Sequence, residues 1–493
     1  MLKDYVLKPL ALAVGLSCLG ASPAMADDRD SQDFGAMVEH LLHEQSERLF
    51  GVKNPLAAPA DETDYVAREL ATAEQRVKLA KGLKAEFVTR KAGLSADMIA
   101  FYPNPEEYSH LIVCLEPGRH GTTPGGFSGY NGSVQRINVE TGAVEMILHG
   151  MSRCDGIRTT DWGTVLATEE NGTDGNAYEI LDPLNTNHHW VASRDGVGDV
   201  RDGVDSVNTS ANVVKRPMLG HFSWEGLEIT PEGVVIAGDE LRPGGGNEGG
   251  AIFKFIPSSP RTADAGMISD LSQSPLAGGT LYALQVGTSD SGQGNQRGAG
   301  KWIGPVDPWA SRQWARDNNA TGYYRPEDLE KDSSYTGPGI RVYVANTGTE
   351  GNKNYAEVLR ITDTDPANAA SAPLVHTFVE GDERRNSFDN VAIQPQTGNV
   401  YAIEDHRYGE IHACLPDGAD QDLISDGCIT IASVVDPNAE PTGFIFDASG
   451  KVAYMVVQHG EQPEALLDFD SNPTTGRTDD LIKITGFKLK HHD

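Results

Sequence analysis

The sequence predicts an all-β fold, a six-bladed β-propeller with short N-terminal helices. Hairpins with polar residues at both ends recur along the chain, and strand patterns continue to the C-terminus without long helical patterns. The 54 glycines and 27 prolines fall between short apolar runs, which is typical of many strands joined by turns. A two-sheet sandwich is the structural alternative, but hairpins covering about 400 residues exceed its usual size.

The recurring unit is a hairpin that opens on a polar residue at position 154, 225, 327, 389 or 440. The irregular spacing predicts blades of unequal length with inserted loops rather than a repeat of fixed period. A hairpin returns its chain to the edge where it began, so the opening and closing residues share one rim. We therefore expect the five hairpins to gather these residues at a single mouth around the propeller axis. The corresponding motif of the sixth blade is not evident in the sequence.

The polar residues at the hairpin ends indicate a metal site. The opening residues are Cys154, Glu225, Arg325 with Glu327, Asp389 with Asn390, and Glu440. The closing residues are Glu169 with Glu170, Asp239 with Glu240, Asn346 with Thr347, Glu404 with Asp405, and Gln458 with His459. Carboxylate and amide oxygens suit hard cations such as Ca²⁺, whereas a thiolate selects a softer transition metal. A thiolate-ligated metal beside calcium is therefore the expected composition.

Arg325 adds a planar cation that can bind a phosphate or carboxylate through two parallel hydrogen bonds. The alternative is a salt bridge to the neighbouring Glu327 or Asp328.

Charge and motif content exclude several classes of function. The chain has 40 basic and 71 acidic residues, a formal net charge of −31, which repels nucleic acid. After the leader, no stretch is long and apolar enough to span a bilayer. Neither a G-x-S-x-G elbow nor an H-E-x-x-H pair is present, which argues against the common serine hydrolases and zinc proteases.

The first 26 residues predict a signal peptide, with Lys3 and Lys8, an apolar run over 10–19 and an A-x-A site ending at Ala26. We expect cleavage after Ala26 and a periplasmic or extracellular mature protein. Residues 27–82 predict a helical extension and linker, with helices over 27–50 and 64–81, before a propeller domain over 83–493.

An oxidising compartment favours cysteine pairing. Cys414 and Cys428 flank an acidic loop and could close it as a disulfide, and Cys114 has the pattern of a buried strand residue. Cys154 differs, because it stands where the other hairpins place a carboxylate.

At these residues the chain resembles the PhoX family of secreted bacterial alkaline phosphatases, from about Glu86 to His459. The similar segments are "RCDGIRTTDWGTVLATEE" from Arg153, "NATGYYRPEDLE" from Asn319, "FDNVAIQPQTGNVYAIED" from Phe388 and "EPTGFIFDASGKVAYMVVQHG" from Glu440. The resemblance implies a six-bladed propeller that holds an iron pair and calcium ions in its central channel and hydrolyses phosphate monoesters.

The resemblance also implies roles for individual residues and the cofactors Fe³⁺ and Ca²⁺. Arg325 and Glu327 would be catalytic, and Arg325 and Asn346 would contact a small phosphate-ester substrate. The implied metal ligands are Cys154, Glu169 or Glu170, Glu225, Asp239 or Glu240, Glu327, Asp389 and Asp405. The leader has no arginine pair, and "RCDGI" places Asp155 and Ile157 where the family has small residues, so the chain is a divergent member.

Two other functions remain open. A calcium-dependent propeller hydrolase of another class, lactonase or phytase-like, is disfavoured by Cys154, because a pure calcium site has little use for a thiolate. A non-catalytic, calcium-stabilised binding propeller is the third hypothesis.

Overall fold

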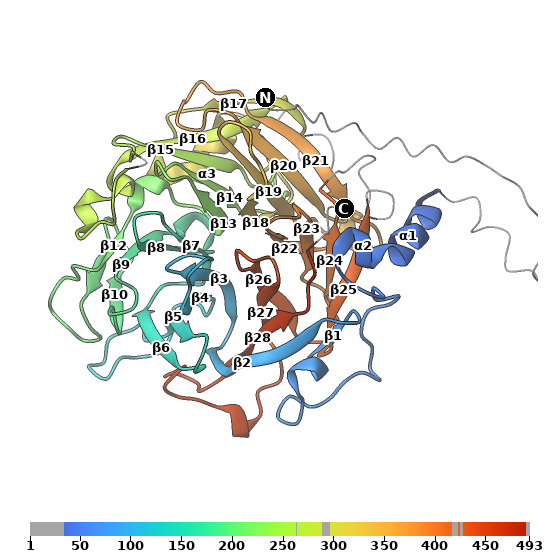
Figure 1. The fold of residues 1–493 in the computed structure, drawn as a ribbon. Helices are drawn as coiled ribbons and strands as arrows, with labels where there is room; N and C mark the ends of the chain where they lie inside the picture. Colours follow the sequence, from blue (N-terminus) through green and yellow to red (C-terminus); the bar gives the residue numbers. More distant parts are fainter. Residues whose placement is uncertain (1–33, 263, 288–295, 417–422, 424–426, 490–493) are drawn as a thin grey trace, which may run out of the picture.

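The computed structural model describes residues 34–262, 264–287, 296–416, 423 and 427–489. The predicted signal peptide lies outside these residues. The strands form sheets arranged around one axis, and one strand of each blade lies innermost (Figure 1). Blade 1 consists of β3 (Ala96–Tyr102), β4 (His110–Leu115), β5 (Gly132–Asn138), β6 (Val144–His149), β10 (His189–Ser193) and β11 (Asp199–Arg201). Blade 2 consists of β7 (Cys154–Thr159), β8 (Thr164–Glu169), β9 (Ala177–Leu181) and β12 (Val213–Lys215).

Blades 3 and 4 belong to one nine-stranded sheet, because β17 (Gly298–Ile303) pairs with an outer strand of each. Blade 3 consists of β13 (Trp224–Ile229), β14 (Val235–Asp239), β15 (Ile252–Pro257) and β16 (Gly279–Val286). Blade 4 consists of β18 (Pro326–Lys331), β19 (Ile340–Asn346), β20 (Glu357–Asp363) and β21 (Leu374–Glu380).

Blades 5 and 6 complete the ring, and each takes one strand from the N-terminal part of the chain. Blade 5 consists of β22 (Phe388–Ile393), β23 (Val400–Glu404), β24 (Glu410–Cys414), β25 (Cys428–Val434) and β1 (Val77–Leu79). Blade 6 consists of β26 (Glu440–Phe446), β27 (Val452–Gln458), β28 (Thr478–Thr485) and β2 (Lys84–Gly93). The inner strands contact one another in the order β3, β7, β13, β18, β22, β26 and back to β3. The predicted six-bladed propeller is therefore confirmed.

The helices are few and short, as predicted. They are α1 (Phe34–Glu44), α2 (Ser46–Phe50) and α3 (Ser311–Asp317). Among the described residues the 3₁₀ turns are η2 (Ala73–Gln75), η3 (Gly172–Asp174), η4 (Pro217–Leu219), η5 (Leu271–Gln273), η6 (Pro275–Ala277), η7 (Pro308–Ala310), η8 (Glu350–Asn352) and η9 (Glu464–Leu466). None of the helices in the described ranges is long and apolar enough to cross a membrane.

The N-terminal extension differs from the prediction of a helix over 64–81. That segment contains only η2 and then β1, which pairs antiparallel with β25. Leu42 and Phe50 pack into the apolar core shared by blades 5 and 6. The extension is therefore an edge strand and a helical cover of blade 5, because its apolar residues gain more by joining an existing core than by forming an isolated helix.

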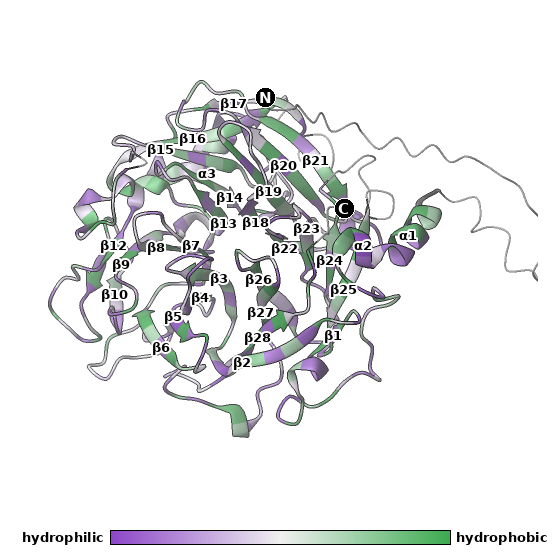
Figure 2. Cartoon of the chain, viewed as in Figure 1, coloured by the Kyte–Doolittle hydropathy of each residue, from purple (hydrophilic) through white to green (hydrophobic). Residues whose placement is uncertain are grey.

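Apolar strand residues fill the space between successive blades, and hydrophobic colour follows the strands in Figure 2. Between blades 3 and 4, for example, Ile236, Leu284, Leu329 and Val344 belong to one buried cluster. These contacts fix the angle between neighbouring sheets and hence the position of their inner edges.

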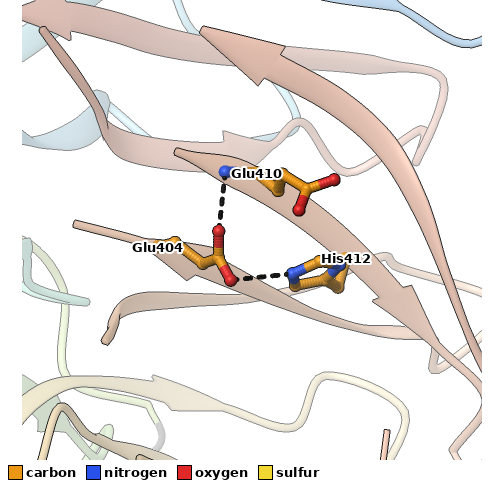
Figure 3. A group of neighbouring side chains, drawn as sticks. All are labelled: Glu404, Glu410 and His412. Carbon is orange, nitrogen blue, oxygen red and sulfur yellow. Dashed lines mark hydrogen bonds and ion pairs between the residues drawn. The ribbon is translucent and has the colours of Figure 1, made fainter. Parts of the chain in front are cut away.

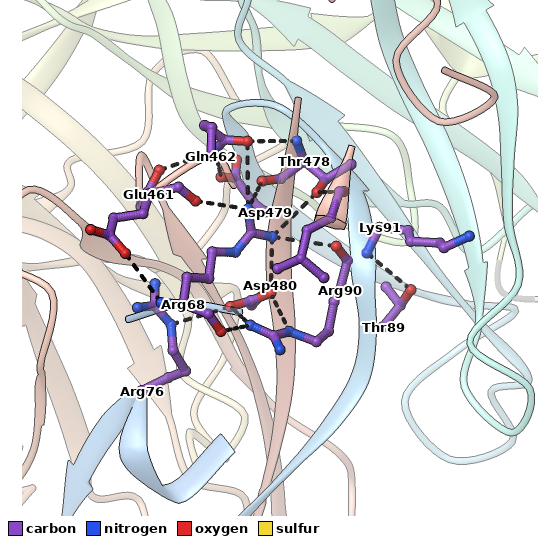
Figure 4. A network of polar contacts seen from close by, with 12 residues as sticks. Arg68, Arg76, Thr89, Arg90, Lys91, Glu461, Gln462, Thr478, Asp479 and Asp480 are labelled. Carbon is purple, nitrogen blue, oxygen red and sulfur yellow. Dashed lines mark hydrogen bonds and ion pairs between the residues drawn. The ribbon is translucent and has the colours of Figure 1, made fainter. Parts of the chain in front are cut away.

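The ring is closed by antiparallel pairing of β2 with β28. Beside this junction Arg68, Arg76 and Arg90 converge on Asp480 of β28, as Figure 4 shows. Nitrogen–oxygen distances to the Asp480 carboxylate are 2.9 Å from Arg68, 3.2 Å from Arg76 and 3.1 Å from Arg90. The carboxylate is fully buried, so it compensates charges that have left water.

Replacing Asp480 by Ala should lower the free energy of unfolding by about 3–5 kcal/mol, because it leaves buried guanidinium groups without their counter-charge. Urea denaturation measures this change. The matched control is Asp64→Ala, which removes a partly exposed ion pair to Lys78 and should cost less than about 1 kcal/mol. Equal losses in the two variants would contradict the proposed role of the junction.

Candidate metal and anion site

The inner strands begin with a common local geometry. Within the first hairpin of a blade, the pairing register shifts by a bulge directly after the first pair. The first pairs are Ala96 with Leu115, Cys154 with Glu169, Trp224 with Asp239, Pro326 with Asn346, and Phe388 with Glu404. In blade 6 the bulge lies further along, after Thr442. The bulge brings the residue after each first pair towards the axis, where acids from different blades meet.

Two groups of these acids lie within ligand distance of one another. One oxygen each from Asp97, Glu116 and Asp155 lie within 4.8 Å, as do oxygens from Glu225, Glu327 and Asp389. We call the following residues the axial cluster: Asp97, Glu116, Asp155, Glu170, Glu225, Glu240, Glu327, Asp389, Asp405 and Glu440.

Burial and mutual repulsion dominate the electrostatics of the axial cluster. Loss of solvation raises the pKa of Asp155 well above its usual range, and the charges of Asp97 and Glu116 raise it further. The pKa of Glu225 is raised in the same way, by burial and then by Asp155 and Glu327. Burial also raises the pKa of Asp97, Glu327, Asp389 and Glu440. An excess of buried carboxylates is therefore held at one place.

These carboxylates fit a set of metal ions. Asp97 Oδ1 and Asp155 Oδ1 are buried and make no hydrogen bond within the described part of the chain. Buried carboxylates are costly unless a cation or hydrogen bond compensates them. Multivalent cations bound between the oxygens would supply that compensation, and oxygen ligands are those that hard cations require.

Arg325 lies against the axial cluster and forms an ion pair with Glu327, the contact that the sequence offered as the alternative to anion binding. Its Nη2 is 2.9 Å from Glu327 Oε1, and its Nε donates to Glu240 Oε1 at 2.6 Å. Burial lowers the pKa of Arg325, but Glu327 and Glu240 outweigh this effect and raise it, so the guanidinium keeps its charge. The salt bridge and an anion-binding role are compatible, because Glu327 also belongs to one of the two groups of acids that could hold a metal ion.

The structure distinguishes Glu169 from Glu170. Both Glu169 oxygens are occupied, by the backbone N–H of Ser152, by Asn176 and by Arg194. Glu170 instead belongs to the axial cluster, where burial, Glu116 and Glu240 raise its pKa to about 7. Glu169 is therefore a structural residue, and Glu170 is the candidate ligand.

Blade 3 repeats this division. Asp239 is buried and accepts from the Ser223 backbone and from both Nε and Nη2 of Arg312. The next residue, Glu240, contacts Arg325 instead. In this geometry Asp239 is bound by Ser223 and Arg312, and Glu240 is the candidate ligand.

Blade 4 places an amide in the corresponding position. Asn346 Nδ2 donates to Glu357 Oε1 at 3.0 Å, and both side chains are buried. Asn346, which was predicted to contact the substrate, is therefore engaged with Glu357 and is not part of the axial cluster.

In blade 5 Glu404 likewise turns away from the axial cluster, while Asp405 joins it. Figure 3 shows Glu404 with Glu410 and His412, whose ligand atoms also lie within 4.8 Å of one another. Glu404 accepts from the backbone N–H of Asn386 and of Glu410, each at 3.0 Å, and lies 3.2 Å from His412 Nε2. His412 has the place that Arg194 and Arg312 have in blades 2 and 3. This group is therefore explained as a structural hydrogen-bonded group.

Cys154 requires the largest correction. Its sulfur is bonded to Cys114 in a disulfide, and the pair is buried in the core between blades 1 and 2. A disulfide sulfur carries no negative charge, so the predicted thiolate ligand is contradicted, and the following residue, Asp155, takes the axial position. The pairing of Cys414 with Cys428, which the sequence left open, is present.

The axial residues Asp97, Glu116 and Asp155 were not predicted. Asp97 and Glu116 belong to blade 1, whose "SADMIAFY" and "HLIVCLEP" segments have the same arrangement of acids around a hairpin. This hairpin could have been recognised from its two acids. It differs from the others because its turn contains Pro103 and Asn104 in place of glycine, and because most of its strand residues are apolar.

Comparison with known proteins gives one family and several structural neighbours. The family model described as alkaline phosphatase PhoX matches residues 116–461. Pseudomonas fluorescens PhoX, solved in complex with vanadate, a transition state analogue, is 18% identical, covers 90% of this chain and 100% of its own, and has a TM-score of 0.57. A gluconolactonase from Xanthomonas campestris is 11% identical, covers 87% of this chain and 96% of its own, and has a TM-score of 0.40. No curated protein sequence matches the chain.

The disulfide assignment predicts that Cys114 and Cys154 resist alkylation when the mature protein is denatured without a reductant. Peptide mass spectrometry should recover the two residues cross-linked in metal-depleted as well as in metal-loaded protein, because the sulfur binds no ion. If Cys154 were alkylated in metal-depleted protein but protected in metal-loaded protein, the result would contradict the disulfide and support a thiolate ligand.

The neighbouring acids Glu169 and Glu170 should respond in opposite ways to the same substitution. Glu170→Gln should lower the metal content with little loss of stability, because it removes one of several repelling carboxylates. Glu169→Gln should keep the metal but lower the free energy of unfolding by about 3–5 kcal/mol, because Arg194 loses its buried counter-charge. Metal analysis with urea denaturation tests both, and loss of metal from Glu169→Gln alone would reverse the assignment.

Proposed function

The chain belongs to the PhoX family of alkaline phosphatases, and from this premise we propose that it is a metal-dependent phosphohydrolase that cleaves small phosphate monoesters. The observation that carries the proposal is the axial cluster, in which buried carboxylates from several blades surround one arginine. Excess negative charge cannot by itself attract a phosphate. It can do so once multivalent cations occupy it, and this combination is typical of phosphoryl-transfer sites.

We propose Ca²⁺ and Fe³⁺ as the cofactors, the latter from the family alone. The axial cluster offers carboxylate oxygens, which suit calcium directly. Iron would have to be held by carboxylates such as Glu170, Glu225 and Glu327, because the Cys154 sulfur is engaged in the disulfide. The bound ions would neutralise charge on the phosphoryl group and activate an oxygen nucleophile.

Arg325 is the residue of this chain that we assign to substrate binding. Glu327 and Glu240 hold its guanidinium from two directions, which limits the freedom it would lose on binding a phosphate. Its side chain is 19% exposed, so water screens its charge less than at the surface. Hydrogen bonds from a fixed cation to the phosphoryl oxygens strengthen as charge develops in the transition state.

We also propose that the mature protein works in the periplasm or outside the cell. Two disulfides support an oxidising compartment, and the basic, apolar and A-x-A segments of residues 1–26 support export.

A calcium-dependent hydrolase of another class is the second candidate, and the Cys114–Cys154 disulfide favours it. A thiolate at Cys154 would disfavour a pure calcium site, but the sulfur is bonded to Cys114 and is no thiolate. Family membership and Arg325 keep the phosphatase ahead.

The test is hydrolysis of 4-nitrophenyl phosphate by the purified mature protein, together with metal analysis. Activity should disappear on chelation and return when metal is restored. Arg325→Ala should lower kcat/KM by about 10²–10³-fold, because it removes a positioned charge that stabilises the transition state.

The matched control is Arg48→Ala on the peripheral helix α2, which should retain activity. Calcium without phosphate release from any monoester would refute the phosphatase and support the second candidate.

A further inference from the structure

Arg153 has the same place in blade 2 that Arg325 has in blade 4. Each directly precedes the innermost strand of its blade and adopts a left-handed backbone, with φ of 54° and 61°. Each carbonyl accepts a hydrogen bond from the residue after the second strand, at 2.8 Å from Glu170 N–H to Arg153 and at 3.1 Å from Thr347 N–H to Arg325. The two arginines therefore start from equivalent points on the rim.

Other blades place a short side chain at this point. Ser95, Ser223 and Ser387 accept the same backbone hydrogen bond, each at 2.9 Å, in blades 1, 3 and 5. Because a left-handed backbone is unfavourable for a long side chain without a specific reason, arginine at two of these positions calls for an explanation.

The two side chains lie at different depths beside neighbouring acids. Arg153 Nη1 is 3.4 Å from Glu170 Oε2, whereas Arg325 contacts Glu240 and Glu327. Arg153 is 55% exposed and Arg325 is 19% exposed, so Arg153 lies nearer to solvent. A substrate whose phosphoryl group reaches Arg325 would extend its remaining part outward, towards the level of Arg153.

We propose that Arg153 binds a second anionic group on the alcohol portion of the substrate. The preferred substrates are then phosphate monoesters whose leaving group carries a carboxylate or a further phosphate. This inference rests on the proposed phosphatase function and adds the class of leaving group to it.

The simpler explanation is a surface ion pair between Arg153 and Glu170. That pair is long, uses one nitrogen of the guanidinium and is half exposed, so it contributes little stability. Glu170 would also be drawn to a bound metal ion, which leaves the arginine fork available for a substrate anion.

Two substrates of matched size separate these explanations: glycerol 3-phosphate and 3-phosphoglycerate, which differ by a hydroxymethyl group in place of a carboxylate. Phosphate release gives kcat and KM for the wild type, for Arg153→Gln and for the peripheral control Arg48→Gln. In Arg153→Gln, kcat/KM should fall about tenfold more for 3-phosphoglycerate than for glycerol 3-phosphate, mainly through KM. Arg153→Lys should restore part of the difference, because it keeps the charge without the fork.

Equal effects of Arg153→Gln on both substrates, with unchanged metal content, would overturn the inference and leave the phosphatase intact. If the wild type hydrolyses neither ester nor 4-nitrophenyl phosphate, the proposed function fails, and the inference fails with it.

Discussion

The antiparallel pairing of β2 with β28 is the constraint on which the site depends. It joins the N-terminal and C-terminal parts of the chain in one blade, so the six inner strands form a closed ring. Within that ring the carboxylates of the axial cluster lie close together although they repel one another and are deprived of water. The energy that opposes this repulsion comes from apolar packing between blades and from the buried Asp480 network at the junction.

The alternation of side chains along a strand explains how one hairpin serves both stability and chemistry. Successive residues point to opposite sides, so in each acidic pair one carboxylate faces the blade and the next faces the axis. Glu169 and Asp239 are bound by arginines, and Glu404 is paired with His412, whereas Glu170, Glu240 and Asp405 are left to the axial cluster. The acids that face the blade accept hydrogen bonds from backbone N–H groups beside the inner strands, and these bonds fix the backbone at the rim.

The fold and much of the axial cluster could be predicted from the sequence, because hairpin ends and the acids beside them are local patterns. Glu225, Glu327 and Asp389 were placed at the rim this way, and the Arg325–Glu327 contact was foreseen as the alternative to anion binding. Which of two adjacent acids faces the axis depends on the bulge, and the bulge has no residue signature strong enough to place it. The acids of blade 1, Asp97 and Glu116, were not predicted because the residues around them are strongly apolar. The partner of Cys154 lies 40 residues away in another blade, and no local pattern specifies such a contact.

The Cys114–Cys154 disulfide gives this protein a different solution at a position where the family resemblance implied a metal ligand. It connects β4 of blade 1 to the first residue of β7 in blade 2. Asp155 directly follows one cysteine, and Glu116 lies two residues beyond the other, so the covalent link holds the strands that carry both acids. The disulfide therefore still bears on the site, because it links two strands that carry mutually repelling carboxylates into the axial cluster. Where the resemblance implied a soft ligand, the chain places the carboxylate of Asp155 in the axial cluster, and such a carboxylate would suit the cations that bind oxygen.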